Sequence, residues 1–146
     1  MEKTSRTRDV MMSAKPFALS VKVVIRDKAG HCLLLKRSLS SKGSPGKWEF
    51  PGGKAELEEK FDEALLREVT EETGLTISLQ RVAGAAEFEL PTRKIAYLIM
   101  EARLESGEVR LSSEHIDFVW VTLGELPTMD LAEQFISFAH WYSKKQ

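Results

Sequence analysis

Residues 53–75 of this 146-residue chain read GKAELEEKFDEALLREVTEETGL, and the apolar positions in this stretch have the spacing of a helix. At about 100° per residue, Phe61, Ala64, Leu65 and Val69 fall on one side of a helical wheel. Gly74 follows them, and glycine is the residue that most easily ends a helix in the left-handed conformation. We therefore predict a helix over residues 57–73.

The acidic residues of this predicted helix lie where a surface helix does not usually place them. Glu68 and Glu72 fall within the apolar arc and Glu71 on its edge, whereas Arg67 falls on the other side. The three glutamates repel one another at these spacings, and the helix macrodipole disfavours them in its last turns. The cluster indicates a bound cation, with Mg²⁺ as the first candidate, then Mn²⁺ and Ca²⁺. The alternative is a solvated acidic face that Arg67 and nearby lysines neutralise.

The flanking sequence alternates predicted strands with turns and closes with a second helix. We expect strands over residues 17–25, 31–36, 48–50, 77–90, 94–104 and 116–122, and a helix over residues 131–142. The first two strands, with a turn at residues 26–30, are typical of a hairpin. This order predicts an α/β (α+β) fold with a mixed sheet flanked by helices. Residues 1–15 are expected to be a flexible leader, and residues 16–146 one domain.

Composition and charge restrict the classes of function. Hydrophobic residues make up 42% and charged residues 29% of the chain, as in an ordinary soluble globular protein. The formal net charge of −1 provides no positive field for nucleic acid or an acidic membrane, and no apolar stretch approaches the roughly 20 residues of a membrane span. We therefore expect no nucleic-acid partner and no membrane. The single cysteine, Cys32, excludes an intramolecular disulfide and fits a cytoplasmic location.

The stretch from Gly53 to Leu75 also carries the motif G-x5-E-x7-R-E-V-x-E-E-x-G-L. At every fixed position it resembles the box of the Nudix hydrolase family. Residues 47–54, KWEFPGGK, resemble the segment that precedes this box in the MutT-like branch. The resemblance implies an α/β/α sandwich with a mixed sheet, in which the box forms a loop-helix-loop within a single Nudix hydrolase domain over residues 16–146.

The resemblance further implies a metal site for Mg²⁺, with Mn²⁺ as a substitute. The implied ligands are one backbone carbonyl and four carboxylates, those of Gly53, Glu68, Glu71, Glu72 and Glu114. Bound metal would neutralise charge on the phosphates and lower the pKa of the attacking water. Within this catalytic set, Glu68 is the first candidate for the base that activates water, and Arg67 would be a strut paired with Glu59 or a neighbour. Of the histidines, only His115 lies next to an implied ligand, although no histidine has a metal-ligand spacing.

Five residues are candidates for substrate binding. Arg37 and Arg93 resemble arginines that contact the nucleotide, and Phe50 resembles an aromatic residue that packs near the base; the alternatives are surface arginines at strand ends and a core phenylalanine. In the MutT-like branch, an asparagine or aspartate before the final helix reads oxidised guanine. This chain has no asparagine there, and Asp130 and Glu133 are the available acceptors. That departure puts a specificity for oxidised guanine in doubt.

Three functions are compatible with these residues. The MutT-like function is hydrolysis of an acid anhydride in a nucleoside triphosphate, which releases a nucleoside monophosphate and pyrophosphate and can sanitise oxidised nucleotides. The enzymatic alternative is hydrolysis of ADP-ribose or another nucleotide sugar. The third is a non-catalytic, nucleotide-binding regulator, although such modules usually lose box glutamates that this chain retains. In each case the partner is a small-molecule nucleotide, and the protein is a monomer or a homodimer.

Overall fold

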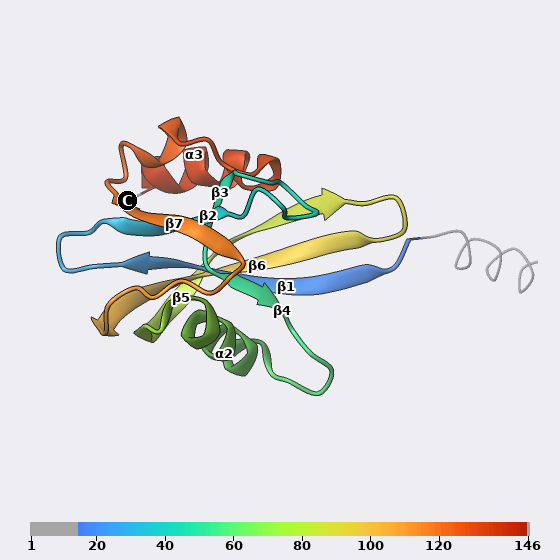
Figure 1. Ribbon diagram of the computed structural model, residues 1–146, viewed down its shortest axis with the longest axis horizontal. Coiled ribbons are helices and arrows are strands. Elements are labelled where there is room, and N and C mark those ends of the chain that lie inside the picture. The colour runs from blue at the N-terminus through green and yellow to red at the C-terminus, as the bar shows by residue number, and fades with distance from the viewer. Residues whose placement is uncertain (1–14, 146) are drawn as a thin grey trace, which may run out of the picture.

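The protein, for which we have a computed structural model that describes residues 15–145, is built around one seven-stranded sheet (Figure 1). The strands are β1 (Phe17–Arg26), β2 (Cys32–Arg37), β3 (Trp48–Glu49), β4 (Gly52–Lys54), β5 (Thr76–Glu89), β6 (Lys94–Ser106) and β7 (His115–Val121). Their order is β3-β2-β1-β6-β5, with β4 also paired to β1 and β7 to β2. β1 and β6 are parallel and the other pairs are antiparallel, so the predicted mixed sheet is confirmed.

Helices cover both faces of the sheet, as Figure 1 shows for α2 (Phe61–Thr73) and α3 (Ile136–Lys145). Successive side chains of a strand point to opposite faces, so β1 contributes to two separate cores. Val23 packs in the cluster that contains Leu65 of α2. Its neighbour Val24 packs in the cluster that contains Phe138 of α3. The predicted α/β/α arrangement is therefore confirmed.

The first two strands form less of a hairpin than the sequence predicts. β1 and β2 pair at Arg26 and Cys32, next to the turn. Beyond that point β1 pairs with β4 and β6, whereas β2 pairs with β3 and β7. The main-chain N–H of Val23 donates instead to the carbonyl of Pro51, at 2.9 Å. The strands separate because each finds a longer partner elsewhere, and this separation brings β4 against β1.

The box helix ends where the sequence predicts but begins four residues later. Leu57 is 97% exposed, and Glu58 has a positive φ of 69°, so the chain turns at residues 57–58 and the helix does not start there. At the other end, Gly74 has a φ of 72° and its N–H donates to the carbonyl of Thr70. The wheel places Phe61 on the buried side, but this first residue of α2 is 41% exposed.

The final helix also begins later than predicted. Two short 3₁₀ helices, η1 (Leu126–Thr128) and η2 (Glu133–Phe135), precede α3, which starts at Ile136 and not near residue 131. Within the predicted range, Phe138 and Tyr142 of α3 are nevertheless buried. A 3₁₀ segment can present apolar residues to the core much as a helical turn does, so the pattern alone does not separate the two.

The expected leader lies almost entirely outside the described residues. Lys15, the first residue described, pairs with Glu89 at 2.6 Å. Within residues 15–145, we find no helix both long and apolar enough to cross a membrane.

Candidate active site

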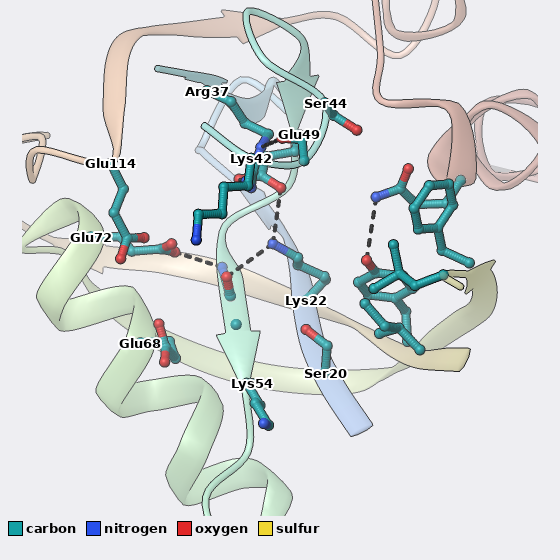
Figure 2. A pocket seen from close by; sticks show the side chains of 18 of the residues that line it. Ser20, Lys22, Arg37, Lys42, Ser44, Glu49, Lys54, Glu68, Glu72 and Glu114 are labelled. Carbon is teal, nitrogen blue, oxygen red and sulfur yellow. Dashed lines mark hydrogen bonds and ion pairs between the residues drawn. The ribbon is translucent and has the colours of Figure 1, made fainter. Parts of the chain in front are cut away.

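A pocket of about 510 Å³ opens beside the C-terminal half of α2. Its walls come from β1, β4, β6, α2 and the loops before β3 and β7 (Figure 2). Pockets of this size hold ligands from small cofactors to nucleotides. Five of the sequence-predicted site residues that line it carry charged side chains: Arg37, Glu68, Glu72, Arg93 and Glu114.

One side of the pocket is acidic. Glu68 and Glu72 reach it from α2 and Glu114 from the loop before β7, and Figure 2 shows the three side chains on the same side of β4. The side chain of Glu72 is buried, and its Oε1 accepts the main-chain N–H of Gly52 at 2.7 Å. Gly53 lies so close to Glu68 that a Cβ there would be 2.7 Å from the carboxylate. A side chain at residue 53 would therefore displace the Glu68 carboxylate from this position.

Arg67 does not point away from the other site residues as the wheel suggests. Its guanidinium binds Glu59 with two hydrogen bonds, of 2.7 and 3.0 Å, and also contacts Glu68 at 3.1 Å and Glu71 at 3.3 Å. The expected pairing with Glu59 is thus present, and it lowers the pKa of Glu59 to about 2. Glu71 is 59% exposed and is not among the residues lining the pocket. Arg67 braces the loop before α2 against the acidic end of the helix.

A buried charged network lies beneath the pocket. Glu49 of β3 binds Lys22 at 3.2 Å, Arg37 at 3.0 Å and a ring nitrogen of His115 at 2.8 Å. Lys22 also donates to the carbonyl of Gly52 at 2.9 Å. Burial opposes the charge of Glu49, but Lys22, His115 and Arg37 outweigh it and lower the pKa of Glu49 to about 2. The network therefore holds β1, β2, β3 and β7 together by charge-assisted hydrogen bonds.

The same environment acts differently on the carboxylates of α2. Burial raises the pKa of Glu72 to about 7, although the charge of Lys22 and the N–H of Gly52 oppose this. Burial also raises the pKa of Glu68, against the charge of Arg67. Burial outweighs the neighbouring cations at both carboxylates, so a further positive charge bound in the pocket would stabilise their ionised forms.

The donor set fits a divalent cation. Ligand atoms of Glu72, Glu114 and His115 lie within 4.8 Å of one another. Carboxylate oxygens are the ligands that Mg²⁺ and Mn²⁺ prefer. The absent side chain of Gly53 leaves the backbone of β4 open toward Glu68. The pocket therefore contains the ligand types that the predicted metal prefers. Within α2, Arg67 is the one basic residue near these carboxylates.

Cations line another part of the pocket. Arg37 and Arg93 were predicted as substrate-binding residues, and Lys42 and Lys54 join them at the pocket. The side chain of Arg37 is held in place at two points. Its Nε donates to the carbonyl of Gly43 at 2.6 Å, and its Nη1 donates to the carboxylate of Glu49 at 3.0 Å. Lys42 lies in the loop between β2 and β3 and is exposed. An anionic ligand would thus meet metal ligands on one side and basic side chains on the other.

A less polar end of the pocket contains a pair that the sequence did not indicate. Gln134 Nε2 donates to the hydroxyl of Tyr97 at 3.3 Å, and both side chains line the pocket with Phe88 and Ile95. Gln134 Oε1 is buried and has no hydrogen-bond partner among the described residues. Buried acceptors are normally satisfied, so the unpaired oxygen marks the Gln134 amide as a candidate ligand contact. The only sequence signal was its position beside the candidate Glu133.

Three of the predicted substrate-binding residues do not line the pocket. Phe50 is fully buried and packs edge-on against Phe135 and Phe138, so it belongs to the core. Asp130 pairs with Lys47 at 2.8 Å on the surface. Glu133 is exposed and lines a neighbouring groove. The structure therefore brings together the predicted metal ligands other than Glu71, but only the arginines of the predicted substrate contacts.

Comparison with known proteins gives consistent matches. The model of the NUDIX domain family matches residues 16–142. A nucleoside triphosphatase NudI from Klebsiella pneumoniae (strain 342) is 32% identical over 114 residues, covering 70% of this chain and 80% of that protein. An 8-oxo-dGTP diphosphatase from Proteus vulgaris is 34% identical over 101 residues, covering 67% of this chain and 88% of that protein. The crystal structure of a MutT protein from Methanosarcina mazei Go1 superposes with a TM-score of 0.83 at 37% identity, covering 90% of this chain and 96% of that one.

Proposed function

This chain belongs to the Nudix hydrolase family, and from that premise we propose that it cleaves a phosphoanhydride bond of a nucleoside triphosphate in a Mg²⁺-dependent reaction. The products are a nucleoside monophosphate and pyrophosphate. The observation that carries the proposal is a nucleotide-sized pocket lined by the buried Glu72 and the partly buried Glu68 of α2 together with basic side chains. The relatives at 32% and 34% identity are a nucleoside triphosphatase and an 8-oxo-dGTP diphosphatase, and these functions support a triphosphate substrate.

The metal would be held by carboxylates of α2 and of the loop before β7. Glu68, Glu72 and Glu114 line the pocket, and Glu71 is near enough to share Arg67 with Glu68. Bound Mg²⁺, or Mn²⁺ in its place, supplies charge neutralisation on the phosphates and a lowered pKa for water. Gly53 allows the backbone of β4 to approach these groups.

The protein's own side chains bind and orient the triphosphate. Arg37, Lys42 and Arg93 contact its phosphate oxygens, because an anionic chain in this pocket has these cations within its walls. Water attacks one of the two phosphorus atoms of the α–β anhydride, and the bond between that phosphorus and the bridging oxygen breaks. If the α phosphorus is attacked, pyrophosphate leaves with the bridging oxygen. If the β phosphorus is attacked, the nucleoside monophosphate keeps it. Glu68 accepts the proton that the water loses.

The nucleobase of the substrate occupies the less polar end of the pocket. Phe88 and Ile95 provide apolar surface there, and the amide of Gln134 with the hydroxyl of Tyr97 provides polar contacts. Because Gln134 Oε1 is an unpaired acceptor among the described residues, it selects a base edge that carries an N–H group. In this proposal Gln134 takes the role for which the sequence suggested Asp130 and Glu133.

The test is a product-resolved assay with Mg²⁺ on nucleoside triphosphates, 8-oxo-dGTP, ADP-ribose and a nucleotide sugar. Release of pyrophosphate and a nucleoside monophosphate from a triphosphate is the expected result. Release of a sugar phosphate from ADP-ribose, with triphosphates untouched, would reassign the substrate to the nucleotide-sugar class. Binding of nucleotides without any turnover would replace the proposal with a regulatory module.

A further inference from the structure

His115 occupies an unusual position for a histidine, buried in the wall between the charged network and the acidic side of the pocket. The residue is 5% exposed. It begins β7 at a bulge, where the pairing with β2 shifts so that Arg37 lies opposite His115 and Ile116 is the extra residue. Bulges re-aim the side chains beside them. The main-chain N–H of His115 donates to the carbonyl of Ser112 at 3.3 Å, which fixes the backbone at this point.

The two ring nitrogens of His115 have different surroundings. Nε2 lies 2.8 Å from Oε2 of Glu49, which is a buried carboxylate already held by Lys22 and Arg37. A carboxylate so surrounded is an acceptor, so the Nε2–H donates and the proton resides on that nitrogen. In the neutral ring Nδ1 then carries a lone pair, and this nitrogen is buried without a hydrogen-bond partner among the described residues. Buried ring nitrogens are rarely left in this state.

A ring nitrogen of His115 lies close to two carboxylates. One ligand atom each from His115, Glu72 and Glu114 lie within 4.8 Å of one another, and these residues come from β7, α2 and the preceding loop. Glu114 is exposed, so its side chain has room to rotate toward a shared ion. A histidine that donates one N–H to a carboxylate and offers the other nitrogen to a metal is a recurrent arrangement in metal sites. Glu49 is the carboxylate in the corresponding position here.

We propose that His115 is a nitrogen ligand of a divalent transition metal held with Glu72 and Glu114. The inference rests on the proposed function, because it uses the same carboxylates. Imidazole nitrogen is a poorer partner for Mg²⁺ than carboxylate oxygen, whereas first-row transition ions accept both. The site is therefore selective for Mn²⁺ and heavier ions of the row over Mg²⁺. Lys22 and Arg37 pair with Glu49 and favour its ionised form, which accepts the Nε2–H of His115.

The direct test is pulsed electron paramagnetic resonance on the full-length protein loaded with Mn²⁺ alone. A directly bound imidazole nitrogen modulates the electron spin echo, and replacing the histidine nitrogens with ¹⁵N changes the modulation in a defined way. The chain has three histidines, so the variants His115→Gln and His140→Gln assign the signal. His140 is exposed on α3 and outside the pocket, which makes it the matched control. We expect the signal in wild type and in His140→Gln, and its loss in His115→Gln.

Binding titrations provide the second readout. Loss of the nitrogen ligand should weaken Mn²⁺ binding by about tenfold and Mg²⁺ binding by about twofold or less, so the selectivity between the ions falls in His115→Gln. An equal loss for both ions would mean that His115 only supports the fold of the site. Should His115→Gln fail to fold, the isotope comparison in the wild-type protein still decides the question.

The outcomes separate this inference from the proposed function. Bound Mn²⁺ without any histidine-nitrogen signal in the wild type would overturn the inference. Mg²⁺-dependent release of pyrophosphate would, in that case, leave the proposed function intact. Absence of binding by every divalent ion would overturn both.

Discussion

Glu72 is a carboxylate that the fold buries almost completely, and the main-chain N–H of Gly52 is its hydrogen-bond donor. Its pKa is raised to about 7 by burial, so its negative charge lacks adequate compensation from the protein alone. Glu71, one residue earlier, is exposed and paired with Arg67. Adjacent glutamates of the same motif thus differ in burial and pairing, and a bound cation would stabilise the charge of Glu72 more than that of Glu71.

Replacing Glu72 with glutamine should separate function from folding. The amide oxygen of Glu72→Gln can still accept the Gly52 N–H, and the shape is retained, but the negative charge that would bind the proposed metal is removed. We expect Mg²⁺-dependent turnover to fall by about two orders of magnitude or more while the fold is retained. Turnover and thermal unfolding of this variant should be compared with those of Glu63→Gln, an exposed carboxylate at the other end of α2. Full activity in Glu72→Gln would contradict the site assignment.

Base recognition is tested by Gln134→Leu, which keeps the approximate volume and removes both polar groups. If Gln134 Oε1 accepts a base N–H, KM for the preferred nucleotide should rise about tenfold with little change in kcat, because one hydrogen bond to the ligand is worth about 1 kcal/mol or slightly more. Discrimination between bases should narrow as well. Gln80→Leu, on β5 and bonded only to Ser78 among the described residues, is the control. An unchanged base preference in Gln134→Leu would place recognition elsewhere in the pocket.

How far the sequence predicts the site depends on the range of the interactions. Glu68 and Glu72 belong to one helix, so the motif and the helical wheel were sufficient to predict that their side chains lie close together. Lys22 was missed although it is a charge inside an apolar strand, because its partner Glu49 is 27 residues away. Gln134 and Tyr97 are 37 residues apart, and no periodicity connects them. Local patterns predict which residues share a face, but not which distant segments meet.

At the scale of elements, the end of α2 was predicted and its beginning was not. The helix end at Gly74 has a local cause, because glycine takes the left-handed conformation at low cost. The sequence alone therefore predicts it. The start has no comparable signal, because Lys60 precedes the helix without a side-chain cap. The separation of β1 from β2 depends on partners that lie far away in the chain, β6 and β7. Turn chemistry therefore predicted the turn at residues 26–30 but not the fate of the strands beyond it.

The C-terminal end of α2 can be tested by Gly74→Ala. A Cβ at this position would meet nothing closer than Arg110 Nε at 3.7 Å, so the cost comes from the φ of 72° and not from a clash. We expect a loss of about 1 kcal/mol in the free energy of unfolding, measured by urea denaturation. Gly124→Ala, where the nearest atom is at 3.9 Å and φ is not in the left-handed region, should change stability by less than roughly 0.5 kcal/mol. Equal effects at the two positions would contradict the conformational explanation.

The whole molecule places its site between two cores that share one sheet. α2 packs on one face and α3 on the other, and the pocket takes residues from both sides, such as Glu72 and Gln134. Lys22 belongs to β1 and binds Glu49, and its Nζ lies over the ring of Phe135, 5.9 Å from the ring centroid. A ligand in the pocket therefore contacts segments that are joined only in the native state, and its binding should be coupled to the stability of the complete fold.

This coupling predicts that Mg²⁺ stabilises the protein against heat. A ligand that binds only the folded state, at a free concentration tenfold above its Kd, adds about 1.4 kcal/mol of stability. For a domain of this size, that increment corresponds to a rise in Tm of roughly 3–6 °C. Differential scanning fluorimetry in EDTA and in increasing Mg²⁺ measures it, and NaCl at matched ionic strength controls for charge screening. The rise should be absent in Glu72→Gln, since this variant lacks a buried ligand charge but keeps the same fold. A similar rise with NaCl, or in both proteins, would mean that the ion acts through general screening and not through the pocket.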